Sequence, residues 1–192
     1  MIAIQPDLNR STAWAAEFIT IAKCWETIIN SMPGCSISGD IDPYALNFTV
    51  KVHQWGTNPI HIKVQKQMEN IKSGPYDLKS FPYSETIQIS TKLLFNNSLT
   101  FRALKRSSLA KIKMLLSQLK YRSKTSRYRI ESNMAYGMHF LDHRFLAENH
   151  VQNLVCVRGH LFGTISGIPK TPEDIQRLID GFLHLKQQID TV

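Results

Sequence analysis

Acidic residues are missing from the middle of this sequence. No Asp or Glu occurs from Thr86 to Ile130, although this stretch holds eleven of the 23 Lys and Arg residues. The whole chain has a formal net charge of +8, whereas the residues outside this stretch comprise 12 basic and 15 acidic ones. The excess of positive charge is therefore local. A local block of cations favours a polyanionic partner for one part of the molecule and does not by itself indicate a fold.

Cysteine and long apolar runs are also scarce. Cys24, Cys35 and Cys156 are the only cysteines of the 192 residues, and none belongs to a CxxC pair. This argues against a disulfide framework and indicates a reducing compartment. No run of 18 apolar residues is present, so no transmembrane helix is expected. The first residues lack the basic start and the apolar run of a secretory signal, and we expect a cytoplasmic protein.

The sequence contains no familiar motif for catalysis or for cofactor binding. A phosphate-binding loop, a Rossmann glycine pattern, a GxSxG elbow and the kinase signatures are all absent. Cys156 lies in the apolar run LVCV, and we expect it to be a buried core residue rather than a nucleophile acting with His160. Asp40 and Asp42 could hold a cation or act as acid and base, but beside Pro43 they are also ordinary turn residues. No cofactor is expected.

Alternating apolar residues predict the strands. Residues 46–52 and 60–64 alternate with a period of two and are separated by the turn sequence GTNP, which indicates an antiparallel hairpin. A third strand is expected over residues 85–95. Gly159-His160 indicates a tight hairpin between two further short strands. Residues 73–84 are rich in Pro, Gly and Ser and are expected to form a loop.

Apolar residues spaced three and four apart predict the first and last helices. The first is expected within residues 11–34 and ends at Pro33-Gly34. The last is expected over residues 171–189, where Thr171 suits the N-cap and Pro172 the first helical position.

Two more helices complete the prediction and set the fold class. One is expected within residues 134–149 and one within the basic segment 101–126. The predicted order is helix, three strands, basic helix, strand, helix, hairpin and helix. Because strands and helices come in runs joined by hairpins, the class is α+β, with antiparallel sheet packed against helices. We expect a single domain over residues 1–192, or two halves, 1–100 and 127–192, joined by the basic helix. The apolar stripe of that helix consists of Leu109, Ile112, Leu115, Leu116 and Leu119.

The second half of the chain has a recurring order of elements. The segments ETIQIS, RYRIES, LDHRFLAENHVQNLVCVRGHLFGTISG and IDGFLHLKQQ follow the pattern strand, linker, strand, helix, hairpin, helix. In this pattern the second half resembles the C-terminal part of uncharacterised bacterial protein families of unknown function. The resemblance implies a bacterial protein and no particular chemistry.

His139, Asp142 and His143 form the densest group of candidate metal ligands, with His150 nearby. On a helix, His139 and His143 are four residues apart and share one face, as zinc ligands can. A metal ion there would indicate a metal-dependent enzyme. The HExxH pattern is absent and no further ligand is dictated by the sequence, so a polar helix side with capping histidines is the alternative.

The basic segment 101–132 is the main functional signal, since it carries ten Lys and Arg residues and Glu131 as its one acid. It could contact nucleic-acid phosphates, with Tyr121 or Tyr128 stacking on bases. It could lie on an anionic membrane as a peripheral contact, through its apolar stripe. It could dock on an acidic protein. A solvated connecting helix without any partner is the remaining alternative.

We therefore expect a non-enzymatic binding or adaptor module with a basic interaction surface over residues 101–129. The expected partner is an acidic protein or an anionic surface. A nucleic-acid-binding protein is the second hypothesis, and a metal-dependent enzyme centred on His139 and His143 is the third. The residues expected to make the interaction are Arg102, Lys105, Arg106, Lys111, Lys113, Lys120, Arg122, Lys124, Arg127 and Arg129.

Overall fold

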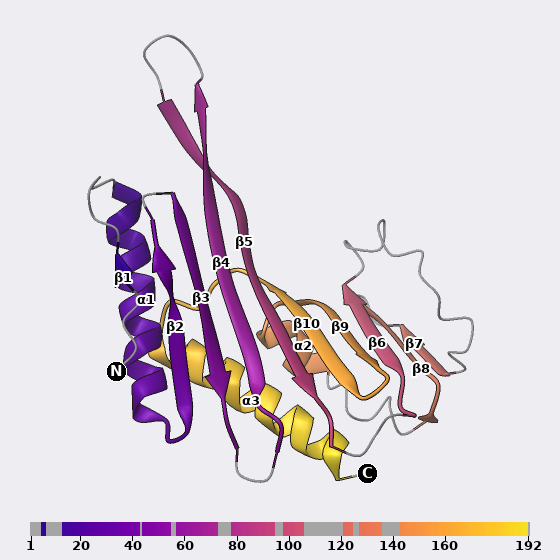
Figure 1. Cartoon of the computed structure of the whole chain (residues 1–192). Coiled ribbons are helices and arrows are strands. Elements are labelled where there is room, and N and C mark those ends of the chain that lie inside the picture. Colours follow the sequence, from indigo (N-terminus) through magenta and orange to yellow (C-terminus); the bar gives the residue numbers. More distant parts are fainter. Residues whose placement is uncertain are drawn as a thin grey trace.

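Strands from the whole length of the chain join one sheet, and ten of them lie within the described residues (Figure 1). The structure is a computed structural model and describes residues 5–6, 13–42, 44–54, 57–72, 78–94, 98–105, 121–124, 127–135 and 143–191. The strands are β1 (Gln5–Pro6), β2 (Cys35–Ile41), β3 (Ala45–Val52), β4 (Ile60–Lys72), β5 (Leu78–Lys92), β6 (Phe101–Lys105), β7 (Tyr121–Lys124), β8 (Tyr128–Ser132), β9 (Val151–Val157) and β10 (His160–Ser166). Their spatial order is β1-β2-β3-β4-β5-β10-β9-β6-β8-β7, and every neighbouring pair is antiparallel except β1 with β2.

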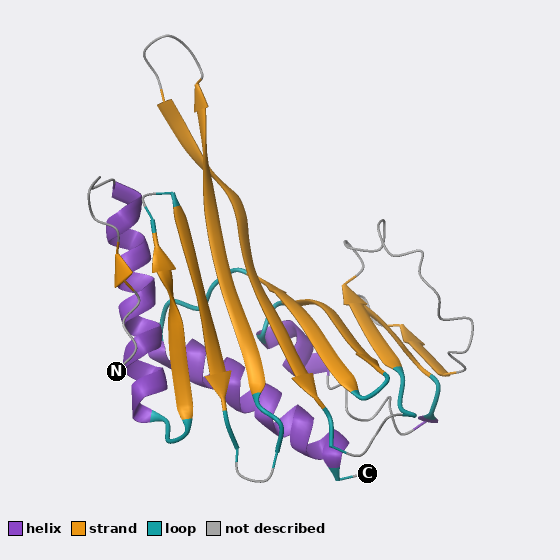
Figure 2. Cartoon of the chain, viewed as in Figure 1, coloured by secondary structure: helices purple, strands orange, loops and turns teal. Residues whose placement is uncertain are grey.

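The helices of the described part of the chain cover one face of this sheet (Figure 2). They are α1 (Ala13–Ser31), α2 (His143–Glu148) and α3 (Pro172–Asp190). On α1, the ring of Trp25 meets the ring of Phe48 on β3 edge-on, with the ring centroids 5.5 Å apart. On α2, the carbonyl of Leu146 accepts a hydrogen bond of 2.8 Å from the hydroxyl of Tyr128 on β8. The α+β class predicted from the sequence is confirmed.

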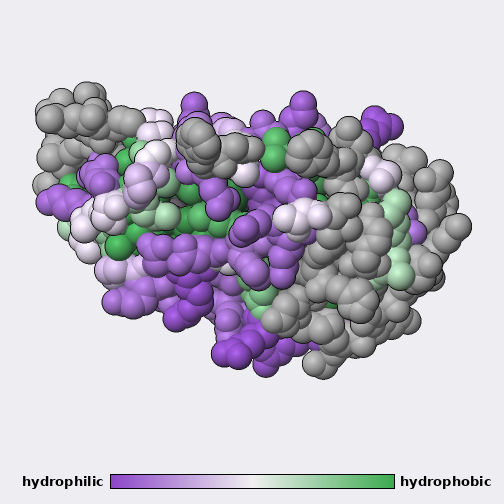
Figure 3. Space-filling view, turned by 90° about the horizontal axis from the view of Figure 1, so that it is seen from below, coloured by the Kyte–Doolittle hydropathy of each residue, from purple (hydrophilic) through white to green (hydrophobic). Residues whose placement is uncertain are grey.

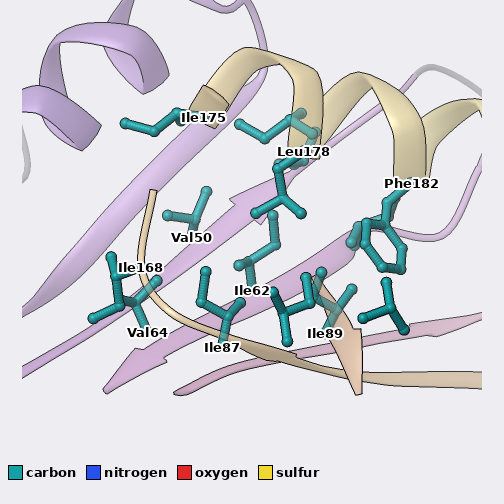
Figure 4. Close-up of a cluster of buried hydrophobic side chains, with 14 of the residues drawn as sticks. Val50, Ile62, Val64, Ile87, Ile89, Ile168, Ile175, Leu178 and Phe182 are labelled. Atoms are coloured by element: carbon teal, nitrogen blue, oxygen red, sulfur yellow. The ribbon is translucent and has the colours of Figure 1, made fainter. Parts of the chain in front are cut away.

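The core lies between α3 and the central strands (Figure 4). The α3 residues that face the sheet are spaced three and four apart, and the strand residues beneath them are spaced two apart. Both periods were visible in the sequence, so the core face of each element was predictable. The buried residues of this contact are Ile175, Leu178 and Phe182 on α3, with Val50, Ile62, Val64, Ile87, Ile89 and Ile168 below them.

α3 begins where the sequence predicts. The hydroxyl of Thr171 accepts a hydrogen bond of 3.3 Å from the backbone N–H of Asp174, which satisfies one of the free donors of the first turn. Glu173 and Asp174 place negative charge at the positive end of the helix dipole. The expected helix over 171–189 is confirmed, as is a first helix within residues 11–34.

The two predicted hairpins are also confirmed, and one of them has an unexpected position. β3 pairs with β4, and β9 pairs with β10. Arg158 and Gly159 join β9 to β10 with φ angles of 50° and 72°, as a type I′ turn requires. The β9–β10 hairpin lies between β5 and β6. Strands from both halves of the chain therefore belong to one sheet.

Gly39 occupies the tightest contact between β2 and β3. A Cβ atom at this position would lie 2.3 Å from the carbonyl oxygen of Asn47 and 2.4 Å from the Cα of Phe48. Both are backbone atoms of the paired strand, so neither can turn aside as a side chain could. Only glycine fits here without separating the strands.

The predicted basic helix 101–126 is wrong at both of its ends. Phe101–Lys105 is strand β6 and Tyr121–Lys124 is strand β7. In β6, Phe101 and Ala103 are buried in the core while Arg102 between them is not, and this period of two belongs to a strand. The apolar stripe from Leu109 to Leu119 lies outside the described residues.

Three smaller predictions also need correction. β5 begins at Leu78, inside the expected loop 73–84, because it pairs with β4 as far as Lys72. Asp40 lies on strand β2 rather than in a turn. Within the expected helix 134–149, the described residues are α-helical only over α2, and residues 136–142 lie outside the described part.

Hydrophilic side chains cover much of the described surface that is visible from below (Figure 3). Hydrophobic side chains are exposed in smaller patches between them. None of the helices in the described ranges combines the length and the apolar character that crossing a bilayer requires.

Candidate polyanion-binding surface

On the face of the sheet opposite the helices, called the open face below, residues of neighbouring strands form cross-strand rows. Residues directly opposite one another in an antiparallel sheet belong to the same face. Following the register from β2 to β7 gives one continuous row that crosses nine strands. This first row consists of Ser36, Lys51, His61, Ser90, Phe162, Val155, Arg102, Glu131 and Arg122.

A second row runs beside the first, two residues along each strand. Between Lys51 and Arg122 the first row crosses seven strand spacings, or about 34 Å at the usual separation of strands. Glu131 is the single acidic residue in the two rows, so the basic residues outnumber the acidic ones along both. The second row consists of Ser38, Thr49, Lys63, Gln88, Thr164, Asn153, Leu104, Arg129 and Lys124.

Three lysines of the open face are exposed to solvent. They are Lys51 on β3, Lys63 on β4 and Lys92 on β5, which are consecutive strands of the sheet. None of the three forms an ion pair with any residue that the structure describes. An unpaired ammonium group retains its charge for an incoming anion, so these lysines are the cations of the open face best placed to bind one.

A shallow hollow of about 320 Å³ lies beside Lys92. His61, Ser90 and Lys92 line one side, and His160 and Phe162 line the other. The rings of His160 and Phe162 are stacked with centroids 5.9 Å apart and an interplanar angle of 16°. Phe162 is 48% exposed. The hollow thus offers a flat aromatic surface, hydrogen-bonding groups and a cation within one small area.

At the other end of the first row, Glu131 neutralises part of the basic segment. Its carboxylate pairs with Arg102 on β6 and with Arg129 on its own strand, where the Nε of Arg129 lies 2.9 Å from Oε1. The Glu131 side chain is only 1% exposed. Burial raises the pKa of Glu131, but the hydrogen bonds from Arg102 and Arg129 outweigh it, so the pKa lies below its usual value.

The predicted binding residues therefore differ in their exposure and in whether an acid already pairs with them. Arg102 and Arg129 are held by Glu131, while Arg127 is exposed just before β8 and Lys105 is half-buried at the end of β6. The register places Arg122 and Lys124 of β7 at the end of the two rows. The remaining predicted residues, which lie outside the described part of the chain, are Arg106, Lys111, Lys113 and Lys120.

The metal site stays a prediction, because His139 and Asp142 lie outside the described residues. His143 is the first residue of α2. Among the residues that the structure does describe, no three His, Cys, Asp or Glu side chains gather as metal ligands would.

The other sequence candidates have structural roles. Cys156 is buried, and its thiol donates a hydrogen bond of 3.6 Å to the carbonyl of Leu99. Burial raises the pKa of Cys156 to about 12, which keeps the thiol protonated and unreactive. The carboxylate of Asp42 accepts hydrogen bonds of 2.7 Å from the N–H groups of Tyr44 and Ala45, and this closes the turn between β2 and β3.

A larger hollow, of about 520 Å³, lies between the end of β10, the residues after α2 and the start of α3. Its two long cations already have partners, because Lys170 lies 2.8 Å from Glu17 and Arg177 lies 3.0 Å from Asp174. Hydrogen bonds from Lys170 and Lys66 hold the pKa of Glu17 below its usual value. This hollow therefore has less capacity than the open face to bind an anion.

Sequence reasoning missed the cations of the open face and Phe162. The alternation in residues 46–52 does separate Lys51 from the core residues, and the same holds for Lys63 in the next strand. What the alternation does not show is which strands are neighbours. Phe162 comes beside Ser90 only because β10 pairs with β5.

Comparison of the chain with protein-family models, with curated proteins and with solved structures finds no match. The resemblance of the second half to uncharacterised bacterial families therefore stays a prediction.

Proposed function

We propose that this protein is a non-enzymatic binding module that holds a polyanionic partner on the open face of its sheet. The observation that carries the proposal is the set of three exposed and unpaired lysines, Lys51, Lys63 and Lys92, on three consecutive strands. Acidic proteins, nucleic acids and anionic lipid surfaces all present closely spaced negative charges that such a surface attracts.

The register connects these lysines with the acid-free segment. Lys51 shares its row with Arg102, and Lys63 shares its row with Arg129. The exposed lysines of β3, β4 and β5 therefore add to the local excess of positive charge noticed in the sequence. The proposed surface therefore centres on β3, β4 and β5 rather than on the segment 101–129 predicted from the sequence.

Binding to heparin tests this proposal, because heparin presents dense negative charge without any base or peptide group. The full chain would be compared with the triple variant Lys51→Gln, Lys63→Gln and Lys92→Gln, at low and at physiological salt. The matched control removes three exposed cations from the helices instead, through Lys23→Gln, Arg144→Gln and Arg177→Gln.

We expect the triple variant of the open face to bind at least tenfold more weakly, because it loses three contacts with the polyanion. The helix variant has the same net charge and should bind almost as the wild type does. Equal losses in the two variants would show a response to net charge alone and contradict the proposal. Absence of heparin binding by the wild type at low salt would contradict it as well.

A further inference from the structure

We infer that the polyanion is a single-stranded nucleic acid and that Phe162 is the platform on which one of its bases stacks. This inference rests on the proposed function, since it names the partner of the same open face. It adds an aromatic contact to the electrostatic one. The two contributions can be separated experimentally.

The setting of Phe162 carries the inference. Phe162 lies in the interior of β10, with Ser90 of β5 and Val155 of β9 directly opposite it. The residue is 48% exposed, and one side of its ring is flanked by the nearly parallel ring of His160. An exposed aromatic ring on a sheet surface, with a second ring stacked beside it, matches the way that sheet surfaces receive unstacked bases.

The lysines lie at suitable distances from this ring. Lys92 is on the adjacent strand and stands directly opposite His160, so it is a diagonal neighbour of Phe162, at about 7 Å. Lys51 is three strands away in the same row, at about 14 Å, and Lys63 is two strands away in the neighbouring row, at about 12 Å. A base on Phe162 would thus have cations on the side of β5, β4 and β3 to receive the phosphates of neighbouring nucleotides.

Polar groups without charge fill the area between the ring and the lysines. Ser90 and Gln88 of β5 and Thr164 of β10 belong to the two rows, and each can donate and accept hydrogen bonds. Base edges and riboses present both donors and acceptors and can use both kinds of group, whereas the carboxylates of an acidic protein only accept hydrogen bonds. An anionic membrane would need a larger apolar surface than one phenylalanine provides. A duplex keeps its bases stacked inside and would leave the ring of Phe162 without a partner.

Fluorescence anisotropy with the full chain tests the inference. The probes are a labelled 12-nucleotide oligothymidine, its oligouridine counterpart, and an abasic phosphodiester oligomer of the same length and charge. Heparin and polyglutamate serve as polyanions without bases. Thymidine and uridine oligomers separate a general single-strand binder from one that also uses the ribose 2′-hydroxyl.

We expect the base-containing oligomers to bind about tenfold more tightly than the abasic one. Phe162→Ala should reduce their affinity to the abasic level and leave heparin binding unchanged, while Phe162→Tyr should retain it. Tyr44→Ala, at another exposed aromatic residue, is the matched control and should have no effect. The triple lysine variant should weaken binding of every probe and reduce the salt slope for oligothymidine by about 2.

Equal binding of abasic and base-containing oligomers, or no effect of Phe162→Ala, would overturn the inference. If heparin binding persisted in that case, the proposed function would stand without a nucleic acid. Tighter binding of polyglutamate than of the oligomers would identify an acidic protein as the partner instead. Failure of all probes to bind would overturn the proposed function as well.

Discussion

Arg102 on β6 and Glu131 on β8 stand directly opposite one another in the sheet, and their side chains form an ion pair. Glu131 is the one acid of the basic segment 101–132, and it is also the most deeply buried charge there that the structure describes. Glu131 therefore neutralises part of the positive charge of this segment. Its arginines hold strands together in addition to contributing positive charge to the open face.

Glu131→Gln should destabilise the protein, because it leaves Arg102 and Arg129 without their counter-charge. Breaking a buried ion pair costs about 3 kcal/mol, and the partial exposure of Arg129 reduces this to about 2 kcal/mol. Urea unfolding at neutral pH measures the loss. Glu148→Gln removes the exposed partner of Arg144 on α2 and should change the free energy of unfolding by less than about 0.5 kcal/mol.

Glu131 should also make stability depend on pH. Its pKa is lower in the folded protein than the reference value of 4.5, so its stabilisation is complete above that value and is lost as the pH falls through the folded pKa. The wild type should lose more stability than Glu131→Gln between pH 5 and about pH 3. Parallel pH profiles of the two proteins would show that the ion pair contributes nothing.

Gly39→Ala should separate β2 from β3. The added Cβ would lie 2.3 Å from the carbonyl oxygen of Asn47, and the paired backbone offers no room. We expect a loss of about 3 kcal/mol or more, measured as a fall in Tm and in the urea midpoint. Ser38→Ala, at the exposed neighbouring position, is the control and should be nearly neutral. A Gly39→Ala protein of wild-type stability would show that the strands can move apart at little cost.

Cys156 should resist alkylation in the folded protein. Its thiol is buried, with a pKa raised to about 12, whereas Cys24 and Cys35 are only partly buried. A maleimide at pH 7.5 should therefore label two thiols slowly under native conditions and the third only in urea, as counted by mass spectrometry. Cys156→Ala should lose the urea-dependent label alone. Rapid labelling of three thiols in the folded wild type would contradict this burial.

Lys186→Met should be more costly than an exposed change on the same helix. The Lys186 ammonium pairs with Asp190 on α3, and the two side chains are 1% and 7% exposed. Asp190 also accepts a hydrogen bond of 2.8 Å from the N–H of Leu94. We expect a loss of about 3 kcal/mol, because the Asp190 charge remains buried without its cation.

The exposed control for Lys186 is Arg177→Met, which should cost less than about 0.5 kcal/mol in the same urea titration. Equal values for the two variants would show that solvent compensates for the buried charge.

Local signals predicted the parts of this fold that depend on local contacts. The cap at Thr171 and the alternation in β3 were readable because the residues that decide them are neighbours in the sequence. The segment Phe101–Lys105 was mistaken for helix because Leu, Ala, Lys and Arg favour helices, while its pairing with β8 and β9 decides the outcome. For the same reason, the sequence indicated the basic segment 101–129 but not the lysines of β3, β4 and β5 that belong to the candidate surface.

Phe162 and Glu131 illustrate that limit in physical terms. The alternation in β10 groups Phe162 with His160, Thr164 and Ser166, but it does not show which strands lie beside it. Glu131 was visible as the single acid of the basic segment, but its burial depends on Arg102, which comes from another strand. Side-chain partners of this kind are set by strand order, which the periodicity of a sequence does not contain.

The position of the β9–β10 hairpin determines when the sheet can be completed during synthesis. β5 and β6 follow one another in the chain, yet two strands made later separate them in the sheet. Until the ribosome has released residues 151–166, both β5 and β6 lack a final neighbour and present open edges, which are prone to wrong pairing. The nascent protein thus carries two unfinished sheets, and a single late hairpin joins them into one.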